Sequence, residues 1–278
     1  MTQRVTVLLC ASVSPWFSHL SMKAIIYSIL FFSGFAVYSQ DLSLYEKHFY
    51  NAPELNLPYR YLRPPVNDSA YPLLIFLHGA LAKGFDNEQQ LQTGGLFFLR
   101  DSIRKNYPAY VMFPQCPEID LWAYFESFDI PGNKRIVFPF NKKPTEVSGV
   151  LMKLIDSLTH ADRIDAKRIY ICGLSQGGMG VLDLIARFPV VFAAGISICG
   201  AGNATTAKRF AGKTSLWLFH GDSDPVIPVQ FSRDYYRRLM KLNADIRYSE
   251  YPGVQHNSWV NAFREPELMD WLFSRHKK

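Results

Sequence analysis

The stretch from Ile169 to Gly180 reads I-Y-I-C-G-L-S-Q-G-G-M-G and predicts a buried strand that ends in a sharp turn before a helix. Residues 169–171 favour a strand, and a helical pattern of apolar residues follows the glycines. Gly173 and Gly177 fit such a turn, because strand and helix backbones meet where a Cβ atom would collide. The G-x-S-x-G pattern in this context predicts a nucleophile elbow that exposes Ser175 near a helix N-terminus.

Apolar runs alternate with helical patterns on both sides of this turn. The apolar runs predict further strands at residues 72–78, 109–113, 192–198, 215–220 and 246–251. Helical spacing predicts helices at residues 91–103, 145–158 and 228–242, and a last helix that ends with residues 268–273. This alternation predicts an α/β fold with a mostly parallel central sheet, helices on both faces and right-handed crossovers. Without a repeat or linker, residues 41–278 are predicted to form a single domain.

Two stretches are less regular. Residues 41–56 show no clean pattern, and the segment around Tyr59 and Tyr61 predicts a short edge strand closed by prolines. Residues 117–144 are long, aromatic and without periodicity. A loop of that length is usually functional, so it is interpreted either as a wall of a substrate site or as structural cover for the sheet.

The chain has 278 residues, 48% hydrophobic and 19% charged, which is typical of a globular protein. Of its 30 basic and 24 acidic residues, Arg4 and Lys23 alone fall within residues 1–40. The remaining basic excess is scattered, which argues against nucleic acid as a partner.

The N-terminal residues predict an export signal. Met22-Lys23 precedes an apolar run at residues 24–37, and small residues follow near a cleavage position. We therefore interpret residues 1–40 as a leader with a signal peptide that starts at Met22. The apolar run is short for a membrane span, so the expectation is a secreted or periplasmic protein without stable membrane insertion.

Cysteine spacing predicts neither a metal site nor a disulfide framework. Cys172 and Cys199 end apolar strands and are expected to be buried small hydrophobes. Pairing of Cys116 with either of them stays open.

A serine nucleophile needs a base, and His256 follows the last predicted strand on a loop in the expected chain order. His78 and His220 each end a strand before a glycine and are predicted to be buried braces. The acid comes from H-G-D-S-D-P, where Asp224 is preferred and Asp222 is the alternative. Ser, Asp and His then follow the chain order of α/β-hydrolases.

Acyl transfer also needs donors for a developing oxyanion. The backbone N–H of Gln176 heads the elbow helix, and the N–H of Ala80 follows the strand at residues 72–78. Trp122 and Trp259 are candidates for lining a substrate pocket, and plain packing is the alternative for both. No cofactor is needed for this chemistry, and no metal is predicted.

Several segments together carry a family resemblance. They are L-L-I-F-L-H-G-A with G-F-D-N-E-Q-Q-L, F-P-Q-C-P, G-L-S-Q-G-G-M-G, H-G-D-S-D-P-V-I-P and Y-P-G-V-Q-H-N-S-W with P-E-L-M-D-W-L. Over residues 58–275 the chain resembles bacterial carboxylesterases often labelled predicted peptidases, relatives of phospholipase/carboxylesterase and polyhydroxybutyrate-depolymerase-like α/β-hydrolases. The resemblance implies Ser175 as nucleophile, Asp224 as acid, His256 as base, and oxyanion donors at Ala80 and Gln176. One difference is residues 81–84, L-A-K-G, where the family usually has G-E-R-G.

Three functions follow as hypotheses. The first is a secreted serine esterase acting on small-molecule or carbohydrate-linked esters, with feruloyl and acetyl esters as candidate substrates. The second is a peptidase of the prolyl-oligopeptidase type, for which residues 41–278 leave no room for a gating domain. The third is a non-catalytic binding module on a hydrolase scaffold, which predicts a broken triad, whereas all three residues are present.

Overall fold

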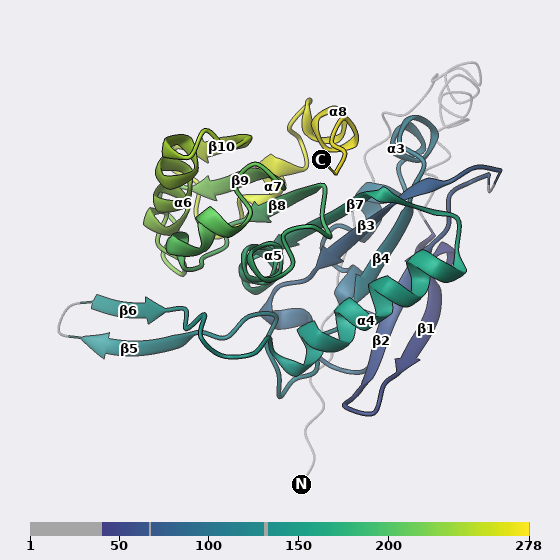
Figure 1. The fold of residues 1–278 in the computed structure, drawn as a ribbon, viewed down its shortest axis with the longest axis horizontal. Coiled ribbons are helices and arrows are strands. Elements are labelled where there is room, and N and C mark those ends of the chain that lie inside the picture. Colours follow the sequence, from purple (N-terminus) through teal and green to yellow (C-terminus); the bar gives the residue numbers. More distant parts are fainter. Residues whose placement is uncertain (1–40, 67, 131–132, 278) are drawn as a thin grey trace, which may run out of the picture. The chain divides into compact units, whose positions relative to one another are not determined.

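An eight-stranded sheet forms the centre of the protein in a computed structural model that describes residues 41–66, 68–130 and 133–277. The strand order is β1-β2-β4-β3-β7-β8-β9-β10 (Figure 1). β1 and β2 pair antiparallel, as do β2 and β4, and the remaining pairs are parallel. The strands are β1 (Glu46–Asn51), β2 (Asn56–Leu62), β3 (Tyr71–Leu77), β4 (Tyr110–Pro114), β7 (Ile164–Leu174), β8 (Ala194–Ile198), β9 (Ser215–Gly221) and β10 (Ile246–Tyr251).

Helices cover both faces of this sheet, as the sequence predicts for an α/β fold. The α-helices are α2 (Gly95–Phe98), α3 (Asp101–Asn106), α4 (Glu146–Ala161), α5 (Gln176–Arg187), α6 (Gln230–Lys241), α7 (Trp259–Ala262) and α8 (Leu268–Phe273). Short 3₁₀ helices are η1 (Leu42–Leu44), η2 (Ala80–Ala82), η3 (Gln89–Leu91) and η4 (Ala204–Arg209). The helix α4 begins after Thr145, whose side chain accepts a hydrogen bond from the Ser148 N–H, as expected for an N-cap.

The alternation of side chains along β3 explains why the core has two layers. Leu73, Ile75 and Leu77 point into a cluster that includes buried residues of α4, α5 and α6. Leu74 and Phe76 point into the opposite cluster, which includes residues of α2 and α8. Because both faces of β3 are covered, its sequence is apolar throughout, as the parallel-strand interpretation requires.

The predicted strands of the parallel sheet are confirmed, and three other expectations are wrong. Residues 41–56 are not irregular, because β1 pairs with β2 there and is the edge strand of the sheet. β2 is consequently an internal strand between β1 and β4. The helix predicted at residues 91–103 is broken into η3, α2 and α3, with Gly94 at a φ of +97° between them.

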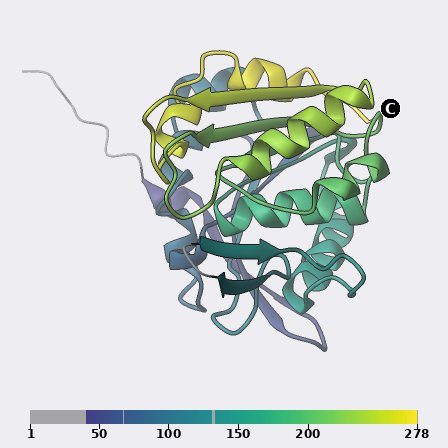
Figure 2. The same cartoon turned by 90° about the vertical axis from the view of Figure 1, so that its left-hand side faces the viewer.

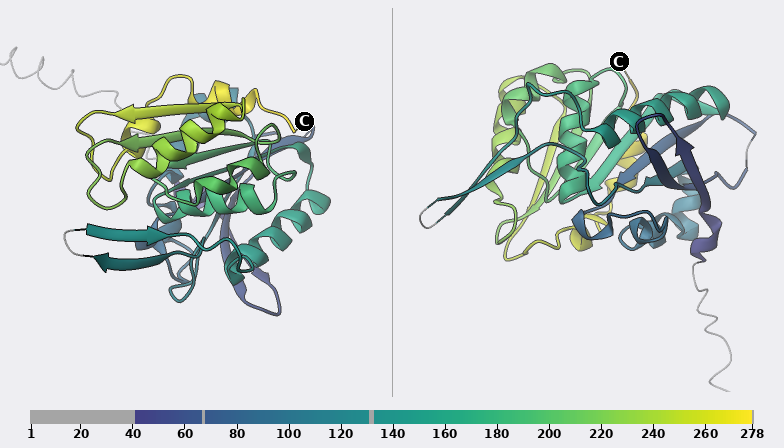
Figure 3. Two further views of the ribbon diagram at one scale, coloured as in Figure 1. Left: turned by 60° about the vertical axis from the view of Figure 1, so that its left-hand side comes forward. Right: turned by 90° about the horizontal axis from the view of Figure 1, so that it is seen from below.

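The aromatic stretch at residues 117–144 contains a two-stranded hairpin, β5 (Glu126–Ile130) and β6 (Asn133–Val137). The hairpin projects away from the central sheet (Figure 3), and it lies at the front of Figure 2. Phe125, Ile136 and Phe138 pack at its base against a small buried cluster that includes Met179 and Ile227. The base of the hairpin therefore packs on the body of the protein, and the choice between substrate wall and structural cover stays open for the rest of the stretch.

The predicted leader, its Met22 start and its cleavage position lie outside the described residues. Within residues 41–66, 68–130 and 133–277, no helix has the length and apolar character needed to cross a bilayer.

Candidate active site

Ser175 lies in the turn between β7 and α5, at the edge of the sheet where the parallel strands end. Its φ of +53° and ψ of −118° are a strained conformation for a residue with a side chain. A Cβ atom on Gly177 would lie 2.0 Å from the Leu77 carbonyl oxygen, and one on Gly173 would lie 2.5 Å from the Gly177 carbonyl oxygen. The two glycines therefore permit the close backbone approach that fixes the serine in this turn.

His256 connects Ser175 to Asp224. Its Nε2 lies 2.9 Å from the Ser175 Oγ, and its Nδ1 lies 2.7 Å from the Asp224 Oδ2. A carboxylate only accepts hydrogen bonds, so Nδ1 carries the proton and Nε2 is free to accept the serine proton. The structure thus brings the predicted serine, histidine and acid into one hydrogen-bonded chain.

Asp222, the alternative acid, lies elsewhere. It is exposed, and its Oδ1 accepts hydrogen bonds from the Ser223 hydroxyl and from the Gly253 N–H at 2.7 Å. Asp222 therefore joins the loop after β9 to the loop after β10. Asp224 is the carboxylate that contacts His256.

Asp224 is held as a carboxylate by its surroundings. Its side chain is fully buried, and burial by itself raises the pKa of a carboxyl group. Hydrogen bonds from His220, His256 and the backbone N–H groups of Ile227 and Val226 outweigh that effect and hold the pKa of Asp224 far below its usual range. The group therefore stays ionised and can stabilise a positive charge on His256.

His220 is a second histidine that contacts the Asp224 carboxylate. It is completely buried, and its Nδ1 lies 2.7 Å from the Ser232 hydroxyl. Its Nε2 lies 3.0 Å from the Ile227 carbonyl oxygen and 3.4 Å from the Asp224 Oδ2. Because both of these atoms accept, Nε2 carries the proton and the ring ties the acid loop to α6. The prediction that His220 braces its loop is confirmed.

Replacing His220 by glutamine is expected to lower kcat/KM by about 10²-fold, mainly through kcat, because Asp224 loses a hydrogen bond that orients it. Steady-state kinetics on a soluble ester give the two constants. His160→Gln is the matched control, since His160 is exposed on α4. Unchanged kinetics in a folded His220→Gln variant would show that Asp224 does not depend on this contact.

One predicted oxyanion donor, Gln176, directly follows Ser175, and the other, Ala80, directly follows Gly79 in the loop after β3. Gln176 is the first residue of α5 and Ala80 the first residue of η2, so their N–H groups have no partner within their own helices. Gly79 brings the two loops together, since a Cβ atom placed on it would lie 3.6 Å from the Ser175 Cβ. The role of these two N–H groups as oxyanion donors stays a prediction.

The two tryptophans have different surroundings. Trp122 is fully buried, and its Nε1–H donates to the His78 carbonyl oxygen at 3.1 Å. Its assignment as a pocket residue is wrong, because it packs beneath the loop after β3. Trp259 is partly exposed, with its ring centre 6.1 Å from that of His256 in an edge-on arrangement. It stays a candidate for contact with substrate.

His78 is the second predicted brace, and it is confirmed. The ring is buried, which lowers its pKa to about 4 and keeps it neutral. Its Nε2 accepts from the Cys116 N–H at 2.9 Å, so Nδ1 carries the proton and donates to the Gly79 carbonyl oxygen at 2.7 Å. The neutral imidazole therefore ties the loop that carries Ala80 to the end of β4.

The sequence did not indicate that Cys199 lies next to the acid and base. Its sulfur, an Asp224 oxygen and a His256 nitrogen all lie within 4.8 Å of one another. Cys199 has a φ of +40° at the end of β8, in a strained conformation that a strand pattern does not signal.

The cysteines in the described part of the chain are all free and buried. No disulfide links Cys116 to Cys172 or Cys199. Burial raises the pKa of Cys116 and of Cys199 to about 12, so both are thiols at neutral pH.

We expect none of these three thiols to react with an aromatic disulfide reagent at pH 8 in the folded protein. The nucleophile is the thiolate, which is scarce far below the pKa and here also shielded from solvent. Peptide mass spectrometry after labelling gives the modified positions. Labelling of all three in guanidinium chloride is the control, and rapid native labelling of Cys199 would contradict its burial behind the triad.

Comparison with known proteins agrees with this geometry. The phospholipase/carboxylesterase family model matches residues 65–267. The carboxylesterase SOBER1 of Arabidopsis thaliana is 26% identical over 204 residues, which cover 68% of this chain and 84% of that protein. Acyl-protein thioesterase 1 of Gibberella zeae is 26% identical over 110 residues, 36% of this chain and 46% of that protein.

The chain is also similar to solved structures of esterases. A thermostable esterase superposes with a TM-score of 0.75 at 33% identity, covering 85% of this chain and 64% of that chain. Among six curated relatives, the spanned share of the relative's length runs from 22% to 84%. The family match covers more than half of the chain and includes the serine, the acid and the histidine. The chain therefore belongs to the phospholipase/carboxylesterase family of α/β-hydrolases.

Proposed function

We propose that the protein is a serine carboxylesterase that hydrolyses carboxylic esters through an acyl-enzyme on Ser175. The observation that carries the proposal is the chain of hydrogen bonds from the Ser175 Oγ through His256 to the buried Asp224. A serine hydroxyl at 2.9 Å from an imidazole nitrogen with a free lone pair is the arrangement that nucleophilic catalysis requires.

The reaction proceeds in two halves. The Ser175 Oγ attacks the ester carbonyl carbon while its proton moves to the His256 Nε2, and the oxyanion lies against the N–H groups of Ala80 and Gln176. Collapse of this intermediate breaks the bond to the alcohol, which takes the proton from His256. Water then attacks the acyl-enzyme with His256 again as base, releasing the carboxylic acid and restoring the Ser175 hydroxyl.

Asp224 supports both halves without giving up its charge. The positive imidazolium that forms twice in each cycle faces this buried carboxylate at 2.7 Å. Its strongly lowered pKa keeps it ionised throughout. The strained Ser175 backbone supports the proposal further, since strain of this kind is retained where it positions a reacting group.

The substrates that we propose are small-molecule or carbohydrate-linked esters, with feruloyl and acetyl esters as the specific candidates. A partly exposed Trp259 beside His256 offers an aromatic face to an aryl group. Export to the periplasm or beyond the cell is part of this proposal, and the apolar run at residues 24–37 supports it.

The test is hydrolysis of p-nitrophenyl acetate, butyrate and octanoate and of methyl ferulate by the purified protein. Turnover of at least one ester by the wild-type protein is expected, and the chain-length profile measures the acyl pocket. Preference for methyl ferulate supports the proposal of an aromatic ester substrate, whereas equal rates with all four esters would contradict that proposal. No turnover by a folded protein, together with cleavage of proline-containing peptides, would replace the esterase with a peptidase.

A further inference from the structure

A cavity of about 900 Å³ lies between the β5–β6 hairpin, η4 and α6. None of Ser175, Asp224 and His256 lines it. The hairpin and α6 both lie at the left of Figure 1. Much of the cavity wall is apolar, with large side chains from the hairpin, Ile136 and Phe138, and from α6 and its C-cap, Phe231 and Leu242. We call this cavity the hairpin groove.

The walls of the hairpin groove are joined to one another. The Phe138 and Phe231 rings meet edge to face with their centres 5.6 Å apart. The Asn203 side chain donates to the Phe138 carbonyl oxygen at 3.5 Å, and the Tyr235 hydroxyl donates to the Asn203 carbonyl oxygen at 3.0 Å. These contacts link hairpin, η4 and α6, so the groove is part of the packed fold.

Basic side chains from two elements line the hairpin groove. Arg237, Arg238 and Lys241 come from α6, where spacings of three and four residues place them on one face of the helix. Lys208 comes from η4, which packs against α6. Asp234 is the one carboxylate in the lining.

Most of this positive charge is not neutralised. Asp234 pairs with Arg237 and also accepts a hydrogen bond from the Gln230 side chain. Arg238 and Lys241 form no ion pair within residues 41–66, 68–130 and 133–277, and the same is true of Lys208. Three unpaired cations therefore line the same cavity as a largely apolar wall.

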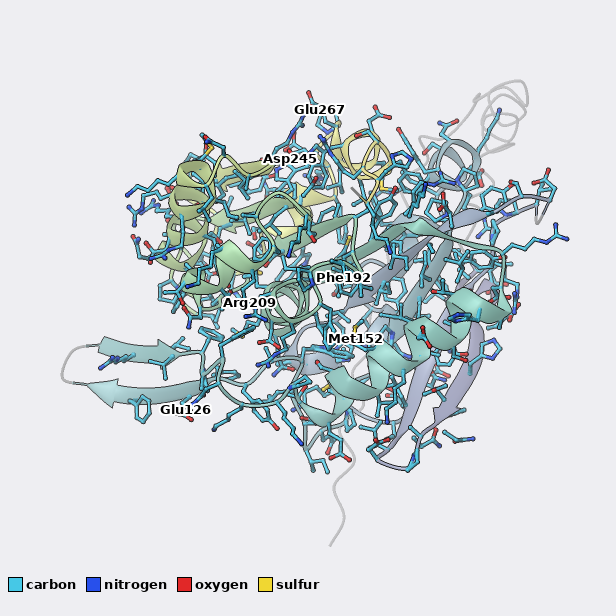
Figure 4. The ribbon with its side chains drawn as sticks, in the orientation of Figure 1. Glu126, Met152, Phe192, Arg209, Asp245 and Glu267 are labelled. Atoms are coloured by element: carbon cyan, nitrogen blue, oxygen red, sulfur yellow. The ribbon has the colours of Figure 1, made fainter. Side chains whose placement is uncertain are left out.

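Arg209, the next residue after Lys208, is a basic residue whose side chain already has partners within the protein. Its Nε donates to the Ala186 carbonyl oxygen at 2.9 Å, and its guanidinium lies 5.2 Å from the centre of the Phe140 ring. Figure 4 labels Arg209 beside α5. Lys208 has neither kind of contact, which leaves its charge available to a ligand.

We propose that the hairpin groove binds an amphiphilic organic anion. The apolar body of the ligand packs against Phe138 and Phe231, and its carboxylate, sulfonate or phosphate pairs with Arg238, Lys241 and Lys208. Cations in the last turn of α6 also stabilise the helix end, but that effect requires neither Lys208 on a separate element nor a cavity with an apolar wall.

The ligand has two sources with the same chemistry: the remote part of an anionic ester, or a separate molecule. Binding to the groove can be tested whether or not the protein is an esterase, because binding is measured without turnover. A suitable probe is 1-anilinonaphthalene-8-sulfonate, an apolar anion that fluoresces in apolar sites. N-phenyl-1-naphthylamine has the same rings without the sulfonate and serves as the neutral probe.

Fluorescence titration of the purified protein is expected to show the anionic probe binding about tenfold more weakly to R238Q/K241Q than to wild type, because two ion pairs are lost. Lys208→Gln, on η4, is expected to weaken it about threefold. The neutral probe binds all three proteins equally. K105Q/K167Q, which removes two exposed cations outside the groove, leaves the affinity for both probes unchanged.

Unchanged affinity for the anionic probe in both groove variants overturns the proposal, as does an equal loss for the neutral probe. The Lys208→Gln variant keeps the test decisive if the double substitution weakens α6. The source of the ligand follows from kinetics with p-nitrophenyl butyrate at a saturating concentration of the anionic probe. A raised KM with unchanged kcat identifies the groove as part of the substrate site, and unchanged constants identify a separate ligand.

Discussion

Ser175→Ala is expected to lower kcat/KM for p-nitrophenyl esters by at least about 10⁴-fold while the fold is retained. The Ser175 Oγ is the only atom of that side chain that His256 contacts in a hydrogen bond, so its removal leaves no nucleophile in the turn. The effect falls on kcat, because the bond that forms in the transition state disappears. Initial rates at several ester concentrations give both constants.

The matched control for this prediction is Ser223→Ala. Ser223 is exposed on the loop after β9, and its hydroxyl contacts Asp222, not the triad. Full activity in this variant separates loss of the nucleophile from loss of any nearby hydroxyl. Appreciable hydrolysis by a folded Ser175→Ala variant would mean that another group attacks the ester.

Gly177→Ala is expected to destabilise the protein by at least about 3 kcal/mol and to reduce activity by more than about 10²-fold. The new Cβ would lie 2.0 Å from the Leu77 carbonyl oxygen, and backbone cannot move aside as a flexible side chain can. The elbow would have to open, which displaces Ser175 from His256. Urea unfolding and ester hydrolysis measure the two effects.

Gly149→Ala is the control for this substitution. Gly149 lies inside α4, and a Cβ atom there meets nothing within 4 Å. The same change is therefore expected to stabilise the protein by about 0.5–1 kcal/mol, because alanine loses less backbone entropy in a helix. Equal stability losses in both variants would contradict the steric explanation of the elbow.

The parallel part of the fold could be predicted because its local patterns and its tertiary environment agree. β3 is apolar throughout since both of its faces are covered, and α4 has a cap and helical spacing that point to the same boundary. β1 could not be predicted in this way. Its residues alternate between exposed and half-buried, and its strand conformation comes from pairing with β2.

The site was predictable where backbone geometry constrains residue type. The glycines around Ser175 indicate the sharp turn, because only glycine fits the close backbone approach there. The positions of Asp224 and His256 after their strands indicate the acid and the base. Contacts across the sheet carry no such local signal. The burial of Trp122, the position of Cys199 beside the acid, and the Ser232 hydrogen bond to His220 all depend on which elements pack together.

The hairpin groove could not be predicted from the sequence either, because it also depends on contacts between separate elements. Sequence patterns placed aromatic residues in the stretch at 117–144, but the pairing of β5 with β6 and the packing of Phe138 on Phe231 were not visible in them. The basic residues of α6 looked like part of a scattered excess. Folding gathers them on one helix face, in the lining of the same cavity as Lys208.

The central claim is that Ser175 is a nucleophile activated by His256, and the most direct test is covalent labelling with a fluorophosphonate probe. Peptide mass spectrometry then locates the adduct. We predict one adduct, on Ser175, whose formation slows by orders of magnitude in His256→Ala. An adduct on another residue, or no adduct on the folded wild-type protein, would contradict the account.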